Sequence, residues 1–274
     1  IFSRIDEKYI GFEESYMSVG ENKRIRAKLK DGQDFVEMQN LINKPREIKD
    51  ECEIKKIAEA EKIGDMAFEY VLGRIKEGVT EREIALDLEF FMKKQGATAL
   101  SFDTISASGI RSAMPHGIAT DKKIENGDFL TLDFGCVFEG YCSDMTRTVV
   151  VGRADAKQRE VYDLCRRMTE HTEASVRAGV TGTSCYEASL EAIKDTEYLP
   201  YNYTGIGHGV GLFVHELPNI GLNCENILQE NSIMTVEPGL YIPGWGGVRL
   251  EDQGIITKDG YENLISATHE LIEL

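Results

Sequence analysis

No part of this sequence is apolar for long enough to cross a membrane, because no apolar run approaches the roughly 18 residues that a spanning helix needs. The 274 residues are 42% hydrophobic, and the mean hydropathy is −0.29. These values are typical of an ordinary soluble globular protein with ample length for a core, and they predict no membrane partner.

The sequence also lacks a block of Lys and Arg. It has 31 Lys and Arg against 47 Asp and Glu, which gives a formal net charge of −16 at pH 7. Such a chain is poorly suited to the phosphate backbone of a nucleic acid, so we expect no nucleic-acid partner. Most of the acidity is interpreted as an aid to solubility.

Cysteine is sparse and irregularly placed. The six cysteines form no CxxC pair, and we expect reduced, mostly buried thiols. Cys136 and Cys142 flank a turn that makes a disulfide geometrically possible, but free thiols are the preferred interpretation. The sequence has no signal peptide and starts at Ile1 instead of Met. We therefore expect a cytoplasmic protein and a longer gene product.

The pattern of the chain changes near residue 45. Residues 1–44 are short apolar pieces broken by Gly11, Gly20 and Gly32, which predict the last strands and helix of an earlier unit. Longer periodic segments follow. We expect a remnant of an N-terminal domain over 1–44 and a catalytic domain over 45–274.

Four helices and a hairpin are predicted in the second domain. Residues 129–137 and 141–151 alternate apolar and polar positions around a Phe-Glu-Gly turn, which favours a hairpin. The helices are expected from residue 47 to a stop at Gly78, from a capping box of Thr80 and Glu83 to Gly96, from Asp155 to Gly179, and from about Thr183 to Lys194.

A short repeat links the two halves of this domain. Gly78-Val-Thr80 and Gly179-Val-Thr181 each separate a long helix from a shorter one, and strands follow in both cases. The repeated order predicts an α+β fold of two pseudo-twofold halves, each made of helix, helix and strands, that enclose a metal site.

Five potential metal ligands are divided between the two strand-rich blocks. They are Asp133, Asp144, His208, Glu237 and Glu251. The two aspartates lie in otherwise apolar strands on either side of the hairpin turn, where side chains can reach one face. Four carboxylates and one imidazole suit a pair of divalent first-row ions.

The charges support a dinuclear site. Four carboxylates carry about −4, which two dications would cancel, and the resulting field could hold a bridging hydroxide. Without metal, four carboxylates that converge on one buried spot would be strongly unfavourable. The set is therefore typical of a hydrolase.

Three further residues are candidates for catalysis or substrate binding. His116 and His215 lie in Gly- or Pro-flanked segments, and we expect them to donate hydrogen bonds to the substrate or the tetrahedral intermediate. Arg249 lies two residues before the last ligand on one strand face. It could orient a ligand carboxylate, contact the substrate or form a simple salt bridge. The other histidines, His171 and His269, are expected at the surface.

These positions and their flanking residues resemble the metal-dependent pita-bread peptidases, which include methionine aminopeptidase, aminopeptidase P and prolidase. The resemblance covers roughly residues 45–274. Met114-Pro-His-Gly117, Val236-Glu-Pro-Gly-Leu-Tyr241 and Gly247-Val-Arg-Leu-Glu-Asp252 are similar to the Xaa-Pro branch. Methionine aminopeptidases typically have Gln where this chain has Arg249.

The resemblance implies two Mn²⁺, Co²⁺ or Zn²⁺ ions and a metal-bridging hydroxide that attacks the scissile carbonyl. It assigns Asp133 to one ion and His208 to the other, while Asp144, Glu237 and Glu251 bind or bridge the pair. Glu237 is also expected to carry a proton from the attacking water to the departing nitrogen, because the tertiary amide nitrogen before proline must be protonated to leave. Relatives are often dimers, so a homodimer is an expected assembly.

The sequence departs from the family at two places. Many Xaa-Pro peptidases have a histidine four residues before the ligand histidine, where this chain has Thr204, so a substrate contact is lost or replaced. Full-length relatives also have a large N-terminal domain, and residues 4–34 resemble only its last part.

The sequence as a whole predicts a metalloexopeptidase of the aminopeptidase P or prolidase type, acting on short peptides with proline in the second position. Three alternatives stay open: a methionine aminopeptidase-like or broader aminopeptidase, a metal-independent creatinase-like hydrolase, and a peptide-binding protein without activity. The complete ligand set disfavours the last two.

Overall fold

The computed structural model describes residues 4–38 and 41–274 and divides the chain into two compact units, Ile1–Arg46 and Glu47–Leu274. The first unit is built from β1 (Tyr9–Phe12), α1 (Val19–Arg26), β2 (Asp34–Glu37) and α2 (Asn43–Arg46). Strands β1 and β2 pair in parallel. Of the predicted segment 1–44, residues 1–3 and 39–40 lie outside the described part, and its origin as a domain remnant stays a prediction.

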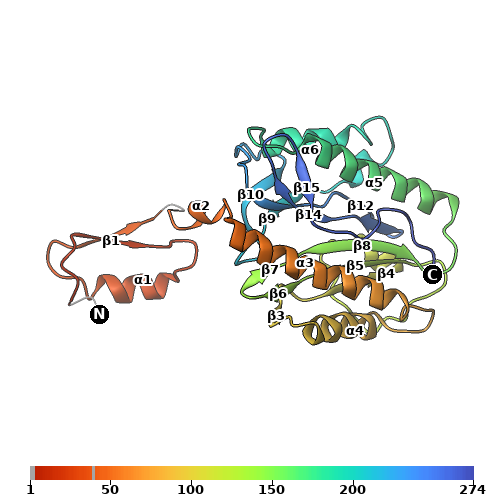
Figure 1. The fold of residues 1–274 in the computed structure, drawn as a ribbon, viewed down its shortest axis with the longest axis horizontal. Coiled ribbons are helices and arrows are strands. Elements are labelled where there is room, and N and C mark those ends of the chain that lie inside the picture. The colour runs from red at the N-terminus through yellow and green to blue at the C-terminus, as the bar shows by residue number, and fades with distance from the viewer. Residues whose placement is uncertain (1–3, 39–40) are drawn as a thin grey trace. The chain divides into compact units, whose positions relative to one another are not determined.

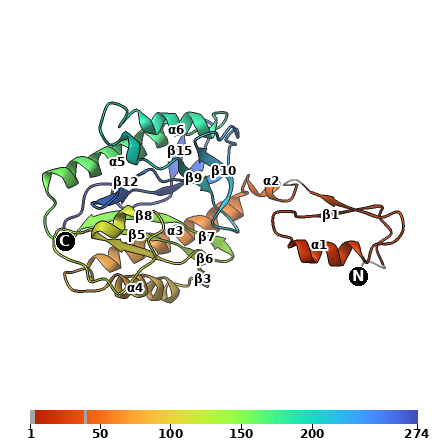
Figure 2. The same ribbon diagram turned by 180° about the vertical axis from the view of Figure 1, so that it is seen from behind.

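In the second unit, strands lie between two pairs of helices (Figure 1). Helices α3 (Glu51–Leu72) and α4 (Glu81–Lys94) cover one side, and α5 (Ala156–Ser175) and α6 (Gly182–Leu190) cover the other. The view from behind shows the same layers (Figure 2). Among the described residues, no helix combines the length and apolar character that a membrane span requires.

The strands form two main sheets, one in each half. The first sheet has the order β4-β5-β8, and the second has the order β10-β9-β11-β14-β15. Two small sheets, β3-β6-β7 and β12-β13, complete the set. The strands are β3 (Ala99–Leu100), β4 (Ile105–Ser108), β5 (Phe129–Phe134), β6 (Cys136–Phe138), β7 (Tyr141–Cys142), β8 (Met145–Val150), β9 (Gly205–Gly209), β10 (Glu216–Gly221), β11 (Ile233–Val236), β12 (Gly239–Ile242), β13 (Gly246–Arg249), β14 (Asp252–Ile256) and β15 (Tyr261–Asn263), with the 3₁₀ turns η2 (Gly109–Ala113) and η3 (Leu199–Tyr201).

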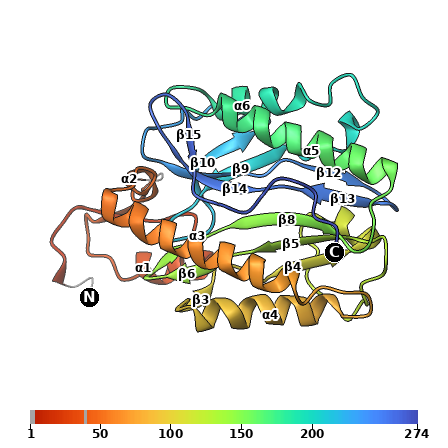
Figure 3. The ribbon, with the colours of Figure 1, turned by 45° about the vertical axis from the view of Figure 1, so that its right-hand side comes forward.

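A single bridge joins the two main sheets. Thr146 of β8 pairs with Glu251, the residue before β14, in antiparallel fashion. The strands β8 and β14 therefore run side by side between the helix pairs (Figure 3). The C-terminal segment closes this region, because the Leu274 amide donates to the Val150 carbonyl at 2.9 Å.

The two halves repeat the same local hydrogen bonds. The amides of Gly78 and Gly179 each donate to a later backbone carbonyl at 2.9 Å, that of Ile124 and that of Leu228 respectively. Both glycines adopt a positive φ, 88° and 90°, which favours glycine over any residue with a Cβ. Thr80 and Thr181 then cap α4 and α6. The predicted pseudo-twofold α+β fold is confirmed.

The predicted helices are present, but several of their ends differ. α3 begins at the capping box of Asp50 and Glu53 and ends at Leu72, before Gly78. α5 begins at the cap Asp155 as predicted, but it ends at Ser175. α6 begins at Gly182 and ends at Leu190, short of the predicted Lys194. The capping residues Thr80 and Asp155 predicted the starts of α4 and α5 correctly, because a cap acts within the first turn of its helix.

The hairpin forms around a turn in which Glu139 and Gly140 both have positive φ, as a two-residue hairpin turn requires. Its ladder is interrupted: β5 pairs with β8, β6 pairs with β7, and Asp144 lies in the gap between β7 and β8. At this interruption the backbone of Gly135 approaches the backbone of Ser143 closely. A Cβ on residue 135 would lie 1.9 Å from the Ser143 carbonyl oxygen. Only glycine allows this approach.

Three apolar clusters hold the layers together. One lies between α3, α4 and the first sheet, one under α5, and one under α6. All six cysteines are free, and four of them are buried. His171 is exposed as expected, but the prediction for His269 was wrong. His269 is half-buried and pairs with Asp252, because the C-terminal segment folds back over β14.

The contact at Gly135 gives a stability test. We expect Gly135→Ala to lower the free energy of unfolding by about 2–3 kcal/mol, because the added methyl group meets backbone that cannot move aside. Gly73→Ala is the matched control, since its Cβ would have only the Tyr70 carbonyl oxygen within 4 Å, at 3.8 Å. Urea unfolding of both variants measures the difference, and equal midpoints would contradict the packing described here.

Candidate metal centre

The structure brings the predicted site residues to one cavity of about 260 Å³. Asp133 comes from β5 and Asp144 from the gap before β8, both in the first half. Glu237 follows β11, and Glu251 precedes β14, both in the second half. These four carboxylates line the cavity together with His116, His215 and Arg249.

His208 of β9 lies directly behind the carboxylates. Its Nε2 atom is 3.2 Å from Glu237 Oε1 and 3.5 Å from Asp144 Oδ2. Its Nδ1 atom is 3.1 Å from the Gly209 carbonyl oxygen. That carbonyl accepts a hydrogen bond from Nδ1–H, which fixes the tautomer and leaves Nε2 as a ligand atom.

Ligand atoms from both halves are close enough to share one ion. Single atoms of Asp144, His208 and Glu251 lie within 4.8 Å of one another. Thr146 supports this group, because its hydroxyl donates to Glu251 Oε2 at 2.5 Å. Thr235 supports the other side by donating to Glu237 Oε1 at 3.2 Å and accepting from the His208 amide at 3.1 Å.

Arg249 is buried and fully engaged with protein groups. Nη2 pairs with Asp133 Oδ2, and Nη1 donates to the Tyr241 hydroxyl at 2.7 Å. Nη1 also donates to the Pro115 carbonyl, and Nε donates to the Thr146 hydroxyl at 3.1 Å. Of the roles left open by the sequence, these contacts agree with a salt bridge to Asp133 and with orientation of that carboxylate. A contact with substrate stays a prediction.

The donor set fits divalent cations. Asp133 Oδ1 is buried and has no hydrogen-bond partner among the described residues, which is costly for a carboxylate oxygen unless a cation binds it. Burial raises the pKa of Asp144 and of Glu251 well above the usual range, and the neighbouring carboxylates raise both further. Burial likewise raises the pKa of Asp133, against the opposing effect of Arg249.

Glu237 and His208 behave as a pair. Burial alone would raise the pKa of Glu237, but its hydrogen bond with His208 holds that pKa below the usual value. Burial likewise opposes protonation of His208, yet the bond to Glu237 raises the pKa of His208 overall. Among the four carboxylates of the site, Glu237 is therefore the one that stays ionised most readily.

The two other predicted histidines lie at the cavity with exposed rings. The His215 ring centroid is 4.3 Å from that of His208. Burial lowers the pKa of His215, and the charges of His208 and His116 lower it further. A neutral His215 ring keeps one N–H for donation at neutral pH.

The sequence missed part of the site. Glu61, in the middle of α3, is buried and accepts the Asp144 amide at 2.8 Å. Tyr241, Thr146 and Thr235 were also missed as site residues. Tyr241 could have been found from the sequence, because it belongs to the Glu-Pro-Gly-Leu-Tyr segment that resembles the Xaa-Pro branch. The threonines and Glu61 give no local signal, because their contacts span distant parts of the chain.

An apolar wall forms part of the cavity lining. It is formed by Phe102, Ile105, Pro115, Ile118 and Tyr203. Thr204, which occupies the position of a family histidine, does not line the cavity, whereas its neighbour Tyr203 does.

A fold of two related halves with a carboxylate and imidazole site between them defines the class of pita-bread metallohydrolases. Known proteins agree with that class. The model of the family "Metallopeptidase family M24" matches residues 55–258. The chain belongs to this family, and the predicted resemblance is confirmed.

Individual relatives are similar over nearly the whole chain. The Xaa-Pro dipeptidase of Pyrococcus horikoshii is 40% identical over 99% of this chain and 79% of its own length. The solved Xaa-Pro dipeptidase from Bacillus anthracis is 42% identical, with a TM-score of 0.95 over 97% of this chain and 75% of that one. The X-Pro aminopeptidase from Thermotoga maritima is 37% identical, with a TM-score of 0.94 and the same coverage.

The raised carboxylate pKa values predict how stability depends on pH. Asp144 and Glu251 have ordinary pKa values of 3.8 and 4.5 when unfolded and much higher values when folded without metal. The folded state then binds more protons, so the free energy of unfolding falls as pH rises above the unfolded values. We expect the melting temperature of chelated protein to fall from about pH 5 to about pH 8.

Added Mn²⁺ should remove this decline, because the cations replace the protons between the carboxylates. Differential scanning calorimetry with chelator and with excess Mn²⁺ measures both series. A melting temperature of chelated protein that stays level or rises over this range would contradict the electrostatics described here.

Proposed function

We propose that this chain is a metal-dependent Xaa-Pro peptidase that hydrolyses the bond between an N-terminal residue and a following proline. The observation that supports it most is that Asp133, Asp144, Glu237 and Glu251 line one cavity, with His208 in contact with two of them. Relatives named Xaa-Pro dipeptidase, 40% identical over nearly the whole chain, support the substrate class.

The five ligands would hold two divalent ions, with Mn²⁺, Co²⁺ and Zn²⁺ as the candidates. When bound, such ions supply Lewis acidity and lower the pKa of water at the site. The protein contributes the geometry. Arg249 orients Asp133, Thr146 orients Glu251, and the Gly209 carbonyl orients His208.

Glu237 is the proposed proton carrier. One of its oxygens is fixed by His208 and by the Thr235 hydroxyl, which holds the carboxylate at the cavity. It would take a proton from the attacking water and pass it to the departing nitrogen. An Xaa-Pro bond needs this step because its nitrogen has no hydrogen and leaves poorly unless protonated.

His116 and His215 are proposed to bind the reacting carbonyl. Both residues line the cavity, and a neutral imidazole donates one hydrogen bond. Such donors stabilise the charge that develops on the carbonyl oxygen in the transition state. The apolar wall of Phe102, Ile118 and Tyr203 would accept the prolyl ring, which offers only carbon atoms to its neighbours.

The cytoplasmic location and the homodimer expected from the sequence remain part of this proposal. The choice between dipeptidase and aminopeptidase is left to experiment, because relatives with both names match this chain.

The proposal is tested with chelated protein and the peptides Ala-Pro, Ala-Pro-Ala, Met-Ala-Ser and Gly-Ala-Ala. We expect Mn²⁺, Co²⁺ or Zn²⁺ to restore cleavage before proline, as detected by mass spectrometry. Glu237→Gln should lower kcat by about 10²- to 10⁴-fold, because it removes the proton carrier. Glu230→Gln makes the same change at an exposed position and should leave kcat unaltered.

Each other outcome favours a different function. Cleavage of Met-Ala-Ser alone would favour a methionine aminopeptidase-like enzyme. Metal-independent turnover of creatine would favour a creatinase-like hydrolase. Tight peptide binding without turnover would favour a binding protein. Any of these results would overturn the Xaa-Pro assignment.

A further inference from the structure

A buried ion pair lies next to the candidate metal centre but outside its cavity. Arg147 of β8 is 1% exposed and Asp252 of β14 is 0% exposed. Arg147 Nη2 donates to Asp252 Oδ1 at 2.7 Å. Each partner directly follows a site residue, Thr146 or Glu251, and successive strand residues point to opposite faces.

The guanidinium of Arg147 ties three segments of the chain together. Nη1 donates to the Glu251 carbonyl at 2.6 Å and to the Thr146 carbonyl at 2.9 Å. Nη2 and Nε also donate to the carbonyls of Ala267 and Thr268 at 2.7 and 3.1 Å. All five N–H groups of the side chain are therefore used, and the strands of both halves are joined to the C-terminal segment.

These bonds meet at the bridge between the two main sheets. The Thr146 carbonyl accepts the Glu251 amide at 3.1 Å as well as Arg147 Nη1. On the cavity side of the same bridge, the Thr146 hydroxyl donates to the Glu251 carboxylate at 2.5 Å and accepts from Arg249. One bridge therefore carries a candidate metal ligand on one face and the ion pair on the other.

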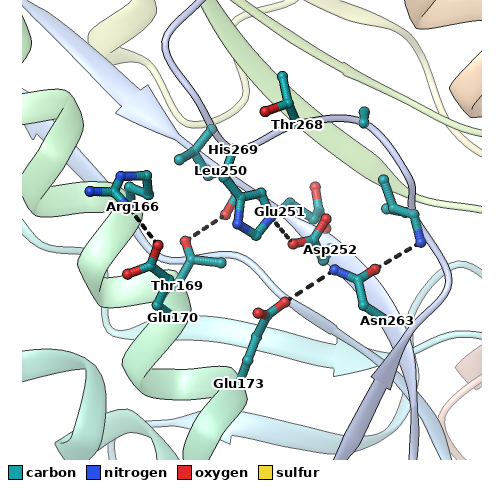
Figure 4. A network of polar contacts seen from close by, with 12 residues as sticks. Arg166, Thr169, Glu170, Glu173, Leu250, Glu251, Asp252, Asn263, Thr268 and His269 are labelled. Atoms are coloured by element: carbon teal, nitrogen blue, oxygen red, sulfur yellow. Dashed lines mark hydrogen bonds and ion pairs between the residues drawn. The ribbon is translucent and has the colours of Figure 1, made fainter.

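Asp252 is itself held from a second direction. Its Oδ2 atom pairs with His269 Nε2, and the imidazole reaches it from the C-terminal segment (Figure 4). Glu173 of α5 approaches from below and accepts from Asn263 Nδ2 at 3.3 Å (Figure 4).

Ligand atoms of Glu173, Asp252 and His269 lie within 4.8 Å of one another, as a metal site would require. The contacts favour a different role. Both oxygens of Asp252 are already taken, one by a guanidinium and one by an imidazole. A guanidinium at 2.7 Å would also repel an added cation. Within this group, His269 supports Asp252, and these contacts do not favour a second metal centre.

A buried ion pair is weak as a source of stability. The cost of removing both charges from water often exceeds their attraction, so an apolar pair would hold the sheets at least as firmly. An apolar pair would not provide the four directed hydrogen bonds that Arg147 donates to backbone carbonyls. Orientation of the bridge is the function that these contacts can perform.

We propose that Arg147, held by Asp252 and His269, is a positioning residue that fixes the bridge between Thr146 and Glu251. The bridge sets the distance between the Glu251 carboxylate and ligands from the first half. This inference shares one assumption with the proposed function, namely that Glu251 is a ligand of the metal centre.

The test uses the full chain with three substitutions: Asp252→Asn, Arg147→Lys and His269→Gln. Asp128→Asn is the matched control, because Asp128 accepts from Lys122 Nζ at the same 2.7 Å and does not line the cavity. Four quantities are measured: Mn²⁺ affinity by calorimetry, kcat and KM with Ala-Pro, melting temperature, and hydrogen exchange of metal-free protein.

We expect Asp252→Asn and Arg147→Lys to weaken Mn²⁺ binding by about 10- to 100-fold, as loss of an outer support of a metal ligand does. kcat should fall while KM stays within about twofold, since the substrate wall is untouched. In metal-free protein, the Glu251 amide should exchange faster. The control should leave Mn²⁺ affinity, kcat and this exchange rate as in the native protein.

Unaltered Mn²⁺ affinity and Glu251 exchange in folded Asp252→Asn or Arg147→Lys would overturn the proposal. If neither of these folds, His269→Gln decides, because its half-buried side chain can be replaced with less risk. It should weaken Mn²⁺ binding at least threefold, and native affinity would overturn the proposal. Native protein that binds Mn²⁺ but cleaves no peptide would refute the proposed function, while the affinity comparison would still test the positioning role.

Discussion

The structure depends on the mutual repulsion of four carboxylates that converge on one cavity. Asp133, Asp144, Glu237 and Glu251 are each held by strands or strand ends, so they cannot move apart to relieve that repulsion. In the absence of metal, burial and the neighbouring carboxylates raise the pKa of Asp144 and of Glu251, which favours protons between them. Divalent cations would relieve it more completely, and the unpaired Asp133 Oδ1 leaves a coordination point for one.

The two halves of the fold supply the opposing ligands. Each half places a glycine turn and a threonine-capped helix before its strands, and each contributes carboxylates from the ends or edges of those strands. The halves are joined at the Thr146–Glu251 bridge, where Thr146 contacts Arg249 and Glu251 on the cavity side. The Arg147–Asp252 pair lies directly at this junction.

Local signals in the sequence predicted the features that depend on local interactions. Thr80 with Glu83, and Asp155, mark helix starts because their bonds lie within one turn. Asp133 and Asp144 were singled out as candidate ligands because each was predicted inside an otherwise apolar strand, where few alternatives explain a carboxylate. Other features depend on contacts between distant residues: Asp252 lies 105 residues from Arg147, and no local pattern pairs them. His269 was placed at the surface for the same reason, since only the folded C-terminal segment brings it to Asp252.

The central claim is that the five residues bind two metal ions between the halves. Anomalous diffraction from crystals grown with Mn²⁺ tests this most directly. We expect two peaks about 3.5–4 Å apart, contacted by Asp133, Asp144, His208, Glu237 and Glu251. Peaks at the Glu173, Asp252 and His269 group, or an absence of peaks between the five residues, would contradict it.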